Sequence, residues 1–214
     1  MKSIDAVIFD MDGVLLDSET ISDKTWFAVA SQMGIGDMHA LLDDCRGRNA
    51  VDTATYLRKR YGADFDADAF LARTHQLFYQ IEEAEGIPLM KGAKAALDYL
   101  SKKYRLALAS STDGVAVHRQ LERAGLLSFF ETCTTGNMVT HSKPDPEIYR
   151  MACASLGVQA ERCCAVEDSP NGIRSAHAAG LLCIMVPDKI QPDDEIRSLA
   201  DFIIPSLEKI GDVL

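Results

Sequence analysis

The sequence lacks any long apolar segment, since no stretch approaches the roughly 20 apolar residues that span a bilayer. It also lacks an excess of positive charge, because 22 lysines and arginines stand against 32 aspartates and glutamates. The resulting net charge of −10 argues against nucleic acid or a membrane surface as the main partner. These absences argue against a membrane-spanning protein and against a protein whose main partner is nucleic acid.

Other patterns are missing as well. The six cysteines form no Cys-x-x-Cys pair, and several lie in apolar runs such as RCCAV and LLCIMV. We therefore expect reduced, mostly buried cysteines rather than disulfides or a zinc site. The first residues, MKSIDAVIFDMDG, do not resemble a signal peptide, so a cytoplasmic protein is expected. A monomer is expected too, because no long apolar helix face is left unassigned.

What the chain does contain is a series of short, continuous apolar runs, typical of buried parallel strands. They cover residues 6–9, 106–109, 163–166, 182–186 and 202–204. Helical patterns lie between them, at 92–103, 115–124, 146–156 and 170–179, and the last three stop at a glycine. Strands that alternate with helices predict an α/β fold, a Rossmann-like doubly wound parallel sheet.

One segment breaks this alternation. Between residues 20 and 85 there is no convincing strand, only helical stretches with breaks at 34–36, 46–49 and 62. We therefore predict an inserted α-helical domain over residues 18–88. The sheet domain is then expected to comprise residues 1–17 and 89–214.

Two aspartates follow the first predicted strand directly. Asp10 and Asp12 stand two residues apart, before Gly13, at the strand end where open α/β sheets bind ligands. Their mutual repulsion is costly unless a cation or a shared proton relieves it, and Mg²⁺ is the natural cation because it suits hard carboxylate oxygens. The alternative is a calcium loop, but that motif requires a late glutamate between two helices, whereas this one follows a strand.

Three further strand ends or loops offer complementary groups. Ser110 and Ser111 follow the run at 106–109, and Glu167 with Asp168 follows the run at 163–166. Lys143 stands between them in a proline-containing loop. Each signal alone has a plain alternative, a helix cap for the serines and aspartate and a solvated surface charge for the lysine. Because they occur in order at successive strand ends, we interpret them together as parts of one site.

These four segments, FDMDGVLLDS, LALASST, SKPDP and VEDS, resemble the four motifs of the haloacid dehalogenase-like hydrolase superfamily, in the same order. The resemblance covers essentially the whole chain. The helical insertion after the first motif resembles the helical-cap subclass, which includes β-phosphoglucomutase and many sugar-phosphate phosphatases. The resemblance implies a magnesium-dependent phosphatase whose cap closes over the site and selects the substrate.

The resemblance also implies residue roles. Asp10 would attack phosphorus and form an aspartyl-phosphate, and Asp12 would protonate the leaving oxygen and then activate water. Ser110, with Ser111 beside it, would bind the phosphoryl group. Lys143 would stabilise charge on that group and on Asp10. Because dehalogenases of this pattern use only the first carboxylate, the intact pair favours phosphoryl transfer.

For the metal, the resemblance implies that Mg²⁺ is held by the Asp10 carboxylate, the Asp12 backbone carbonyl and Asp168. Glu167 would be a further ligand or a neighbour of one. The expected substrate is a small phosphorylated metabolite, with a sugar phosphate favoured.

The insertion leaves alternatives open. Arg46 and Arg48 interrupt its helical pattern and suit the far end of an anionic substrate, although two exposed arginines are an equally good reading. Ser22 stands where β-phosphoglucomutase has a histidine, and the cap-loop arginine of that enzyme would fall near Ala50, which favours hydrolysis over a mutase reaction. A catalytically idle metal-binding relative is the remaining alternative, but Asp10 and the other key groups are all present.

Overall fold

The computed structural model describes residues 3–45 and 50–214, and the chain divides into two compact units. One unit comprises Met1–Asp17 and Ile87–Leu214, and the other is Ser18–Gly86. The second boundary therefore falls two residues before the one expected from sequence, so Ile87 and Pro88 belong to the first unit. The reason is backbone pairing, since the Asp17 amide donates to the Pro88 carbonyl at 2.8 Å.

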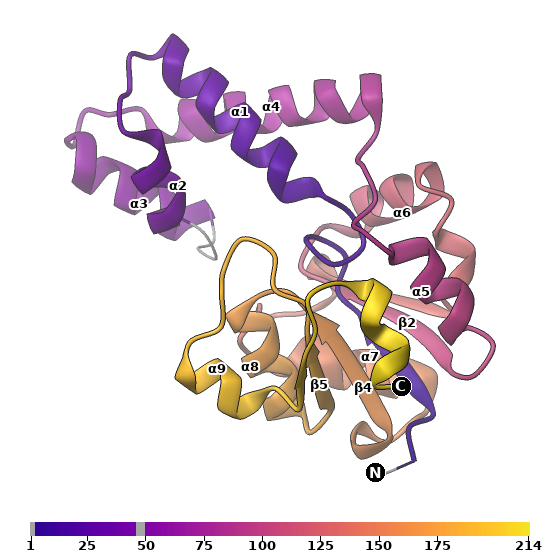
Figure 1. The fold of residues 1–214 in the computed structure, drawn as a ribbon. Coiled ribbons are helices and arrows are strands. Elements are labelled where there is room, and N and C mark those ends of the chain that lie inside the picture. Colours follow the sequence, from indigo (N-terminus) through magenta and orange to yellow (C-terminus); the bar gives the residue numbers. More distant parts are fainter. Residues whose placement is uncertain (1–2, 46–49) are drawn as a thin grey trace. The chain divides into compact units, whose positions relative to one another are not determined.

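The first unit is built on a six-stranded sheet in the order β3-β2-β1-β4-β5-β6, with every pairing parallel (Figure 1). Its strands are β1 (Ala6–Phe9), β2 (Arg105–Ser110), β3 (Thr132–Thr135), β4 (Cys163–Glu167), β5 (Leu182–Met185) and β6 (Phe202–Ile203). In the central register, Phe9 lies opposite both Leu108 and Val166. The predicted Rossmann-like parallel sheet is confirmed.

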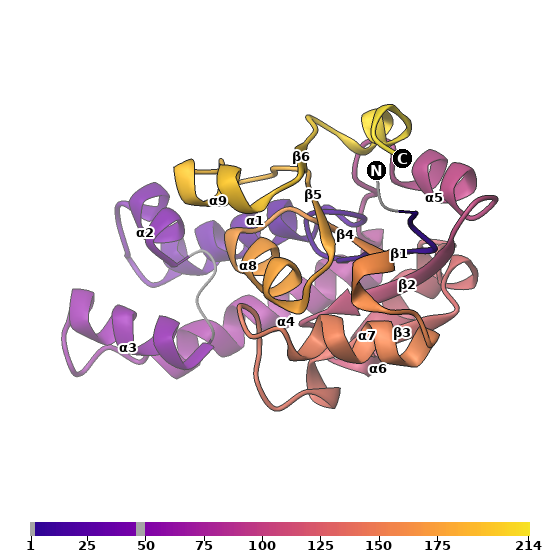
Figure 2. The same cartoon turned by 90° about the horizontal axis from the view of Figure 1, so that it is seen from below.

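Helices cover both faces of this sheet, which can be followed from a second direction in Figure 2. They are α5 (Ala93–Leu100), α6 (Gly114–Arg123), α7 (Glu147–Leu156), α8 (Pro170–Ala179) and α9 (Asp194–Leu199). Alternate residues of β1 point to opposite faces, so Val7 and Phe9 pack with α5 and α6. Ala6 and Ile8 pack with α7, α8 and α9 on the other face. Both faces are buried, which explains why the strands read as continuous apolar runs.

Local sequence fixes where α8 begins and ends. The Ser169 hydroxyl oxygen accepts a hydrogen bond from the Gly172 amide, and Pro170 occupies the first turn, where its missing N–H costs nothing. Gly180 then ends the helix with a φ of 89°, a left-handed conformation that glycine adopts without strain. Glu167 and Asp168, the two residues that precede the Ser169 cap, therefore lie at the carboxyl end of β4.

The second unit is helical, as predicted, with α1 (Ser18–Gln32), α2 (Met38–Cys45), α3 (Ala50–Tyr61) and α4 (Ala67–Glu85). It has its own apolar core, in which Leu41, Leu57 and Phe70 are fully buried. Trp26 packs edge-to-face on Phe70 with ring centroids 5.1 Å apart, so it belongs to this core. Arg46 and Arg48 lie outside the described residues.

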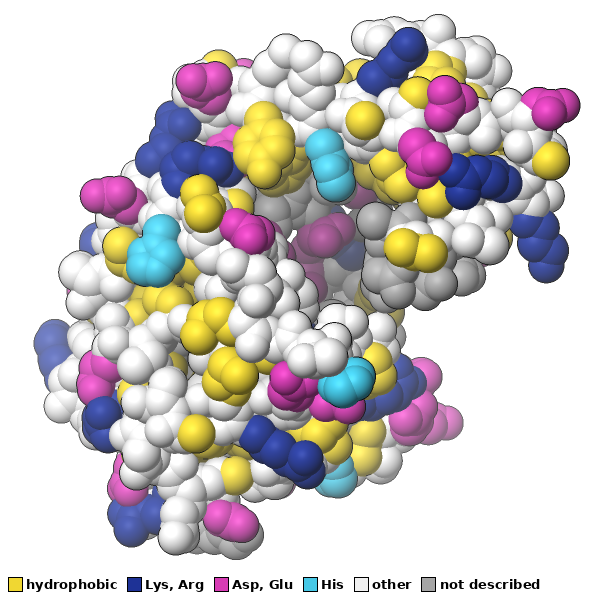
Figure 3. Space-filling model, turned by 180° about the vertical axis from the view of Figure 1, so that it is seen from behind, with side chains coloured by type: hydrophobic (Ala, Val, Ile, Leu, Met, Phe, Trp, Pro, Cys, Tyr) yellow, Lys and Arg dark blue, Asp and Glu magenta, His cyan; other side chains and the backbone are white. Residues whose placement is uncertain are grey.

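The surface carries charges of both signs. On the face drawn in Figure 3, Lys and Arg side chains are interspersed with Asp and Glu. Five of the six cysteine side chains are buried, which agrees with their apolar sequence context. Within residues 3–45 and 50–214, no helix combines the length and apolarity needed to cross a bilayer.

Candidate active site

The candidate site lies at the carboxyl edge of the sheet, where the ends of three adjacent strands meet. Asp10 directly follows β1, Ser110 ends β2 and Glu167 ends β4, and β1 is paired with both of the other strands. The Asp10 amide donates to the Val166 carbonyl at 3.0 Å, which extends the β-ladder to Asp10. Parallel pairing thus brings Asp10 close to residues that lie 100 or more positions further along the chain.

Lys143 joins two of these strand ends. Its Nζ donates to Asp10 Oδ1 and to Glu167 Oε1, both at 2.6 Å, and to the Ala109 carbonyl at 3.0 Å. The Lys143 side chain is only 8% exposed, and the Glu167 side chain is fully buried. The lysine is therefore not a solvated surface charge but a buried cation shared between two carboxylates, as the strand-end pattern indicates.

Burial dominates the electrostatics of this pair. It raises the pKa of Asp10 to about 8, with the nearby charges of Glu167 and Asp12 adding to the rise and Lys143 opposing it. Burial lowers the pKa of Lys143, but the charges of Asp10 and Glu167 outweigh it and hold that pKa above its ordinary value. An uncompensated negative charge on Asp10 is thus costly, and a further cation at the site would relieve that cost.

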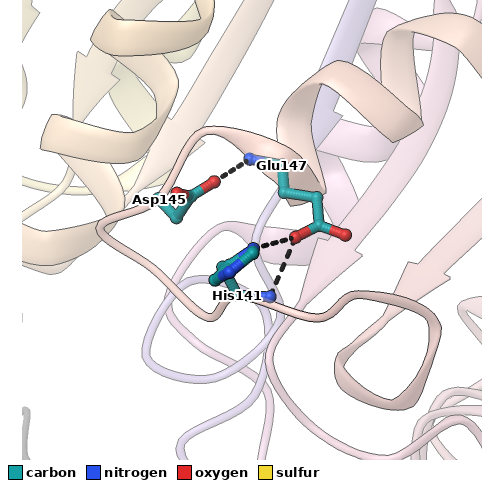
Figure 4. A group of neighbouring side chains, drawn as sticks. All are labelled: His141, Asp145 and Glu147. Atoms are coloured by element: carbon teal, nitrogen blue, oxygen red, sulfur yellow. Dashed lines mark hydrogen bonds and ion pairs between the residues drawn. The ribbon is translucent and has the colours of Figure 1, made fainter.

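The loop that carries Lys143 is fastened by Glu147, at the start of α7 (Figure 4). The Glu147 carboxylate accepts hydrogen bonds from the Thr140 amide at 2.9 Å and the His141 amide at 2.8 Å. These bonds lower the pKa of Glu147. The ring Nδ1 of His141 lies 3.0 Å from the same carboxylate, and Asp145 Oδ1 accepts from the Glu147 amide. The acidic residues of this loop therefore hold its backbone in place.

Asp12 has a partner that the sequence did not single out. Thr112 Oγ1 donates to Asp12 Oδ2 at 2.8 Å, and the Thr112 amide donates to the Ser110 hydroxyl oxygen at 3.1 Å. The only sequence signal was its place next to the two serines after β2. Ser110 is buried and Ser111 is exposed. Thr112 thus links the end of β2 to the second aspartate of the first motif.

Thr112→Val is expected to lower kcat about 10- to 100-fold, because one hydrogen bond to a charged group contributes roughly 1.5–3 kcal/mol. The valine keeps the shape of the side chain but leaves Asp12 without this donor. Steady-state kinetics on a phosphate ester would measure the effect. Thr132→Val is the matched control, since the Thr132 hydroxyl contacts only Ser155 Oγ among the hydrogen bonds described for it. Equal kcat values for the two variants would contradict a role for Thr112.

Three carboxylates meet in a way that suits a hard cation. Asp10, Glu167 and Asp168 each offer an oxygen atom, and these atoms all lie within 4.8 Å of one another. Gly13 has a φ of +74°, and a Cβ added there would lie 2.4 Å from Asp168 Oδ2, so the glycine makes room for that carboxylate. An all-oxygen donor set beside a buried Asp10 fits Mg²⁺.

Glu167 differs from the other two carboxylates in its bonding. Oε1 accepts from Lys143 and from the Tyr149 hydroxyl at 2.7 Å, and Oε2 accepts from the Ser169 hydroxyl at 3.2 Å. The Asp168 and Ser169 amides also donate to Oε2, at 3.2 and 3.4 Å. Both oxygens of Glu167 are thus engaged within the protein.

Comparison with known proteins identifies the class that this fold and site define. The profile of the haloacid dehalogenase-like hydrolases matches residues 4–180. The phosphorylated carbohydrates phosphatase of Thermotoga maritima is 31% identical over 182 residues, 83% of this chain and 82% of that relative. Protein CbbY of Cereibacter sphaeroides is 30% identical over 221 residues, 97% of this chain and 94% of that relative.

Two further relatives extend the comparison. Hexitol phosphatase A of Escherichia coli is 29% identical, covering 95% of this chain and 91% of that relative. The crystal structure of CbbY from Rhodobacter sphaeroides in complex with phosphate gives a TM-score of 0.78 at 26% identity, covering 97% of this chain and 96% of that chain. The chain belongs to the haloacid dehalogenase-like hydrolase family, so the resemblance read from its four motifs is confirmed. The phosphatases named among its relatives support an enzyme of that kind.

Proposed function

We propose that this protein is a magnesium-dependent phosphatase that hydrolyses a small phosphorylated metabolite through an aspartyl-phosphate on Asp10. The observation that carries the proposal is the buried Asp10–Lys143 pair at the end of β1, with Asp12 two residues further along. A carboxylate nucleophile, an adjacent acid and a fixed cation are the groups that phosphoryl transfer through a covalent intermediate requires.

In the first half of the reaction, an oxygen of the Asp10 carboxylate attacks phosphorus, and the bond from phosphorus to the ester oxygen breaks. Asp12, held by the Thr112 hydroxyl, donates its proton to the leaving oxygen. The Lys143 ammonium lies against Asp10 and stabilises the negative charge that gathers on the transferred group. Ser110 is proposed to donate a hydrogen bond to a phosphoryl oxygen.

In the second half, Asp12 takes a proton from a water molecule as that water attacks phosphorus. The bond from phosphorus to Asp10 breaks, inorganic phosphate leaves, and both carboxylates return to their starting states. Asp12 thus serves first as an acid and then as a base. The proton that it gives to the leaving oxygen is replaced by a proton from the attacking water.

The Asp10 carboxylate, the Asp12 backbone carbonyl and the Asp168 carboxylate are proposed to hold Mg²⁺. When bound, the ion supplies positive charge that offsets the phosphoryl oxygens and the buried carboxylates. Both oxygens of Glu167 already accept hydrogen bonds. We therefore propose that Glu167 holds Lys143 in place and does not coordinate Mg²⁺ directly. Burial disfavours the ionised form of Asp10, and the charge of the bound ion would favour it. The ionised carboxylate is then the form that attacks phosphorus.

Chelation with EDTA is expected to abolish phosphate release, and Mg²⁺ is expected to restore it. Asp168→Asn should raise the Mg²⁺ concentration for half-maximal activity at least about 10-fold, because it removes one anionic ligand. The matched control is Asp194→Asn, at an exposed position in the first turn of α9. An unchanged magnesium requirement in Asp168→Asn would remove this residue from the site.

The proposed substrate is a sugar or polyol phosphate. Two relatives are named for such substrates, a phosphorylated carbohydrates phosphatase and a hexitol phosphatase, each over more than four-fifths of this chain. A phosphosugar mutase would need a bisphosphate activator and would release little inorganic phosphate. Ser22, at the place of the mutase histidine, favours the phosphatase.

The deciding experiment measures inorganic phosphate released from a panel of hexose, pentose and hexitol phosphates, with Mg²⁺ and with chelator. Magnesium-dependent release from members of the panel is expected, and their ranking would define the substrate. Without release from any ester, β-glucose 1-phosphate would be tested with its bisphosphate activator, and isomerisation there would replace the phosphatase by the mutase.

A further inference from the structure

Tyr149 lies on α7, outside the four motifs, and its hydroxyl reaches the site. The side chain is fully buried, in the apolar cluster that also contains Ile148, Ala152 and Ile173. Its hydroxyl donates to Glu167 Oε1 at 2.7 Å, the same oxygen that accepts from Lys143 at 2.6 Å. The Lys143 Nζ also lies 5.2 Å from the centroid of the Tyr149 ring. One side chain therefore contacts both partners of the buried ion pair.

The Glu167 carboxylate is held in place by its other contacts. Its Oε2 accepts from Ser169, and a Cβ added to Gly172 would lie 1.9 Å from the Glu167 Cδ, so the start of α8 presses against the carboxylate. Packing alone would be served equally well by phenylalanine, whereas a buried hydroxyl is stabilising only with a partner. The tyrosine hydroxyl thus points to a role in the Glu167 contact.

We propose that Tyr149 is a positioning residue that keeps Lys143 shared between Glu167 and Asp10. This inference rests on the proposed function. By donating to Oε1, the phenol takes up part of the negative charge that otherwise acts on Lys143 alone. Lys143 then keeps its bond to Asp10 and stays available to the transferred phosphoryl group. Without the phenol, the ammonium pairs more closely with Glu167 and less well with Asp10.

The test is Tyr149→Phe, which keeps the ring and removes only the hydroxyl. With an aryl phosphate such as para-nitrophenyl phosphate and saturating Mg²⁺, kcat is expected to fall about 10-fold while KM stays within about twofold. Tyr104→Phe is the matched control, because Tyr104 packs against the apolar cluster on the other face of the sheet. In a Glu167→Gln background the Tyr149 substitution should cause no further loss, since both act through one contact.

A second measurement needs no substrate. The Lys143 ammonium signal, assigned in ¹⁵N NMR spectra by its loss in Lys143→Met, is expected to shift in Tyr149→Phe and to stay in place in Tyr104→Phe. A changed signal in a protein that releases no phosphate would uphold the positioning role and overturn the phosphatase. An unchanged signal and unchanged kcat, with only a lower melting temperature, would overturn the positioning role and leave the phosphatase standing.

Discussion

Asp10→Asn is expected to lower phosphate release at least about 10,000-fold, the scale of loss when a covalent nucleophile is removed. The asparagine amide has nearly the same shape but is a poor nucleophile, so no aspartyl-phosphate forms. Phosphate release under saturating Mg²⁺ would measure the loss, and incorporation of labelled phosphate into the wild-type protein would report the intermediate.

The fold of this variant is expected to persist. Burial already disfavours the charged form of Asp10, so a neutral amide at that position is compatible with its surroundings. Thermal melting would check this, and Asp194→Asn provides the surface control, expected to match wild type in both activity and stability. Wild-type turnover by Asp10→Asn would refute the covalent mechanism as a whole.

Lys143→Met is expected to have the second-largest effect, on activity and on stability together. The methionine fills the space of the lysine stem but leaves the carboxylates of Asp10 and Glu167 buried without their cation. Removing one partner of a buried ion pair typically costs about 3–5 kcal/mol of unfolding free energy. Urea unfolding would measure this loss, and kcat should fall at least about 1,000-fold because the transferred charge loses its fixed cation.

The loss of stability in Lys143→Met is expected to grow as the pH rises. Lys143 is the group that lowers the pKa of Asp10, so its removal moves that pKa above about 8. A carboxyl group whose pKa is raised by folding stabilises the folded state at low pH, and that contribution disappears as the pH rises towards the folded pKa. The variant should therefore be less destabilised at pH 6 than at pH 9. Lys102→Met, at an exposed position, should show neither effect.

The sequence predicted the fold well where burial leaves a strong pattern. The strands β1, β2 and β4 lie at the centre of the sheet, and their two buried faces require continuous apolar residues. The strand β3, with the sequence TCTT, was not predicted. It lies at the sheet edge and has only two fully buried residues, so its threonines carry no continuous apolar signal.

The candidate site was predictable in part for the same kind of reason. Asp10 and Asp168 follow strands whose ends necessarily meet, so their proximity follows from topology. The contact of Lys143 with Glu167 depends on the path of a loop, which is fastened by backbone bonds to Glu147 that no spacing rule encodes. From sequence, Tyr149 is predicted only as an apolar core residue of a helix. The sequence does not show whether its hydroxyl has a hydrogen-bond partner.

The pairing at residues 15–17 and 88–90 has a consequence for how such a protein changes over evolutionary time. The Asp17 amide bonds to the Pro88 carbonyl, and the Met90 amide bonds to the Leu15 carbonyl at 2.9 Å, so the chain leaves and re-enters the sheet unit at one stem. The strands of the sheet and the residues Asp10, Lys143 and Asp168 all lie in the first unit, so the residues beyond this stem can be exchanged without removing any of them. Where the helical unit selects the substrate, as the resemblance to the helical-cap subclass implies, the substrate can change while these catalytic candidates stay the same.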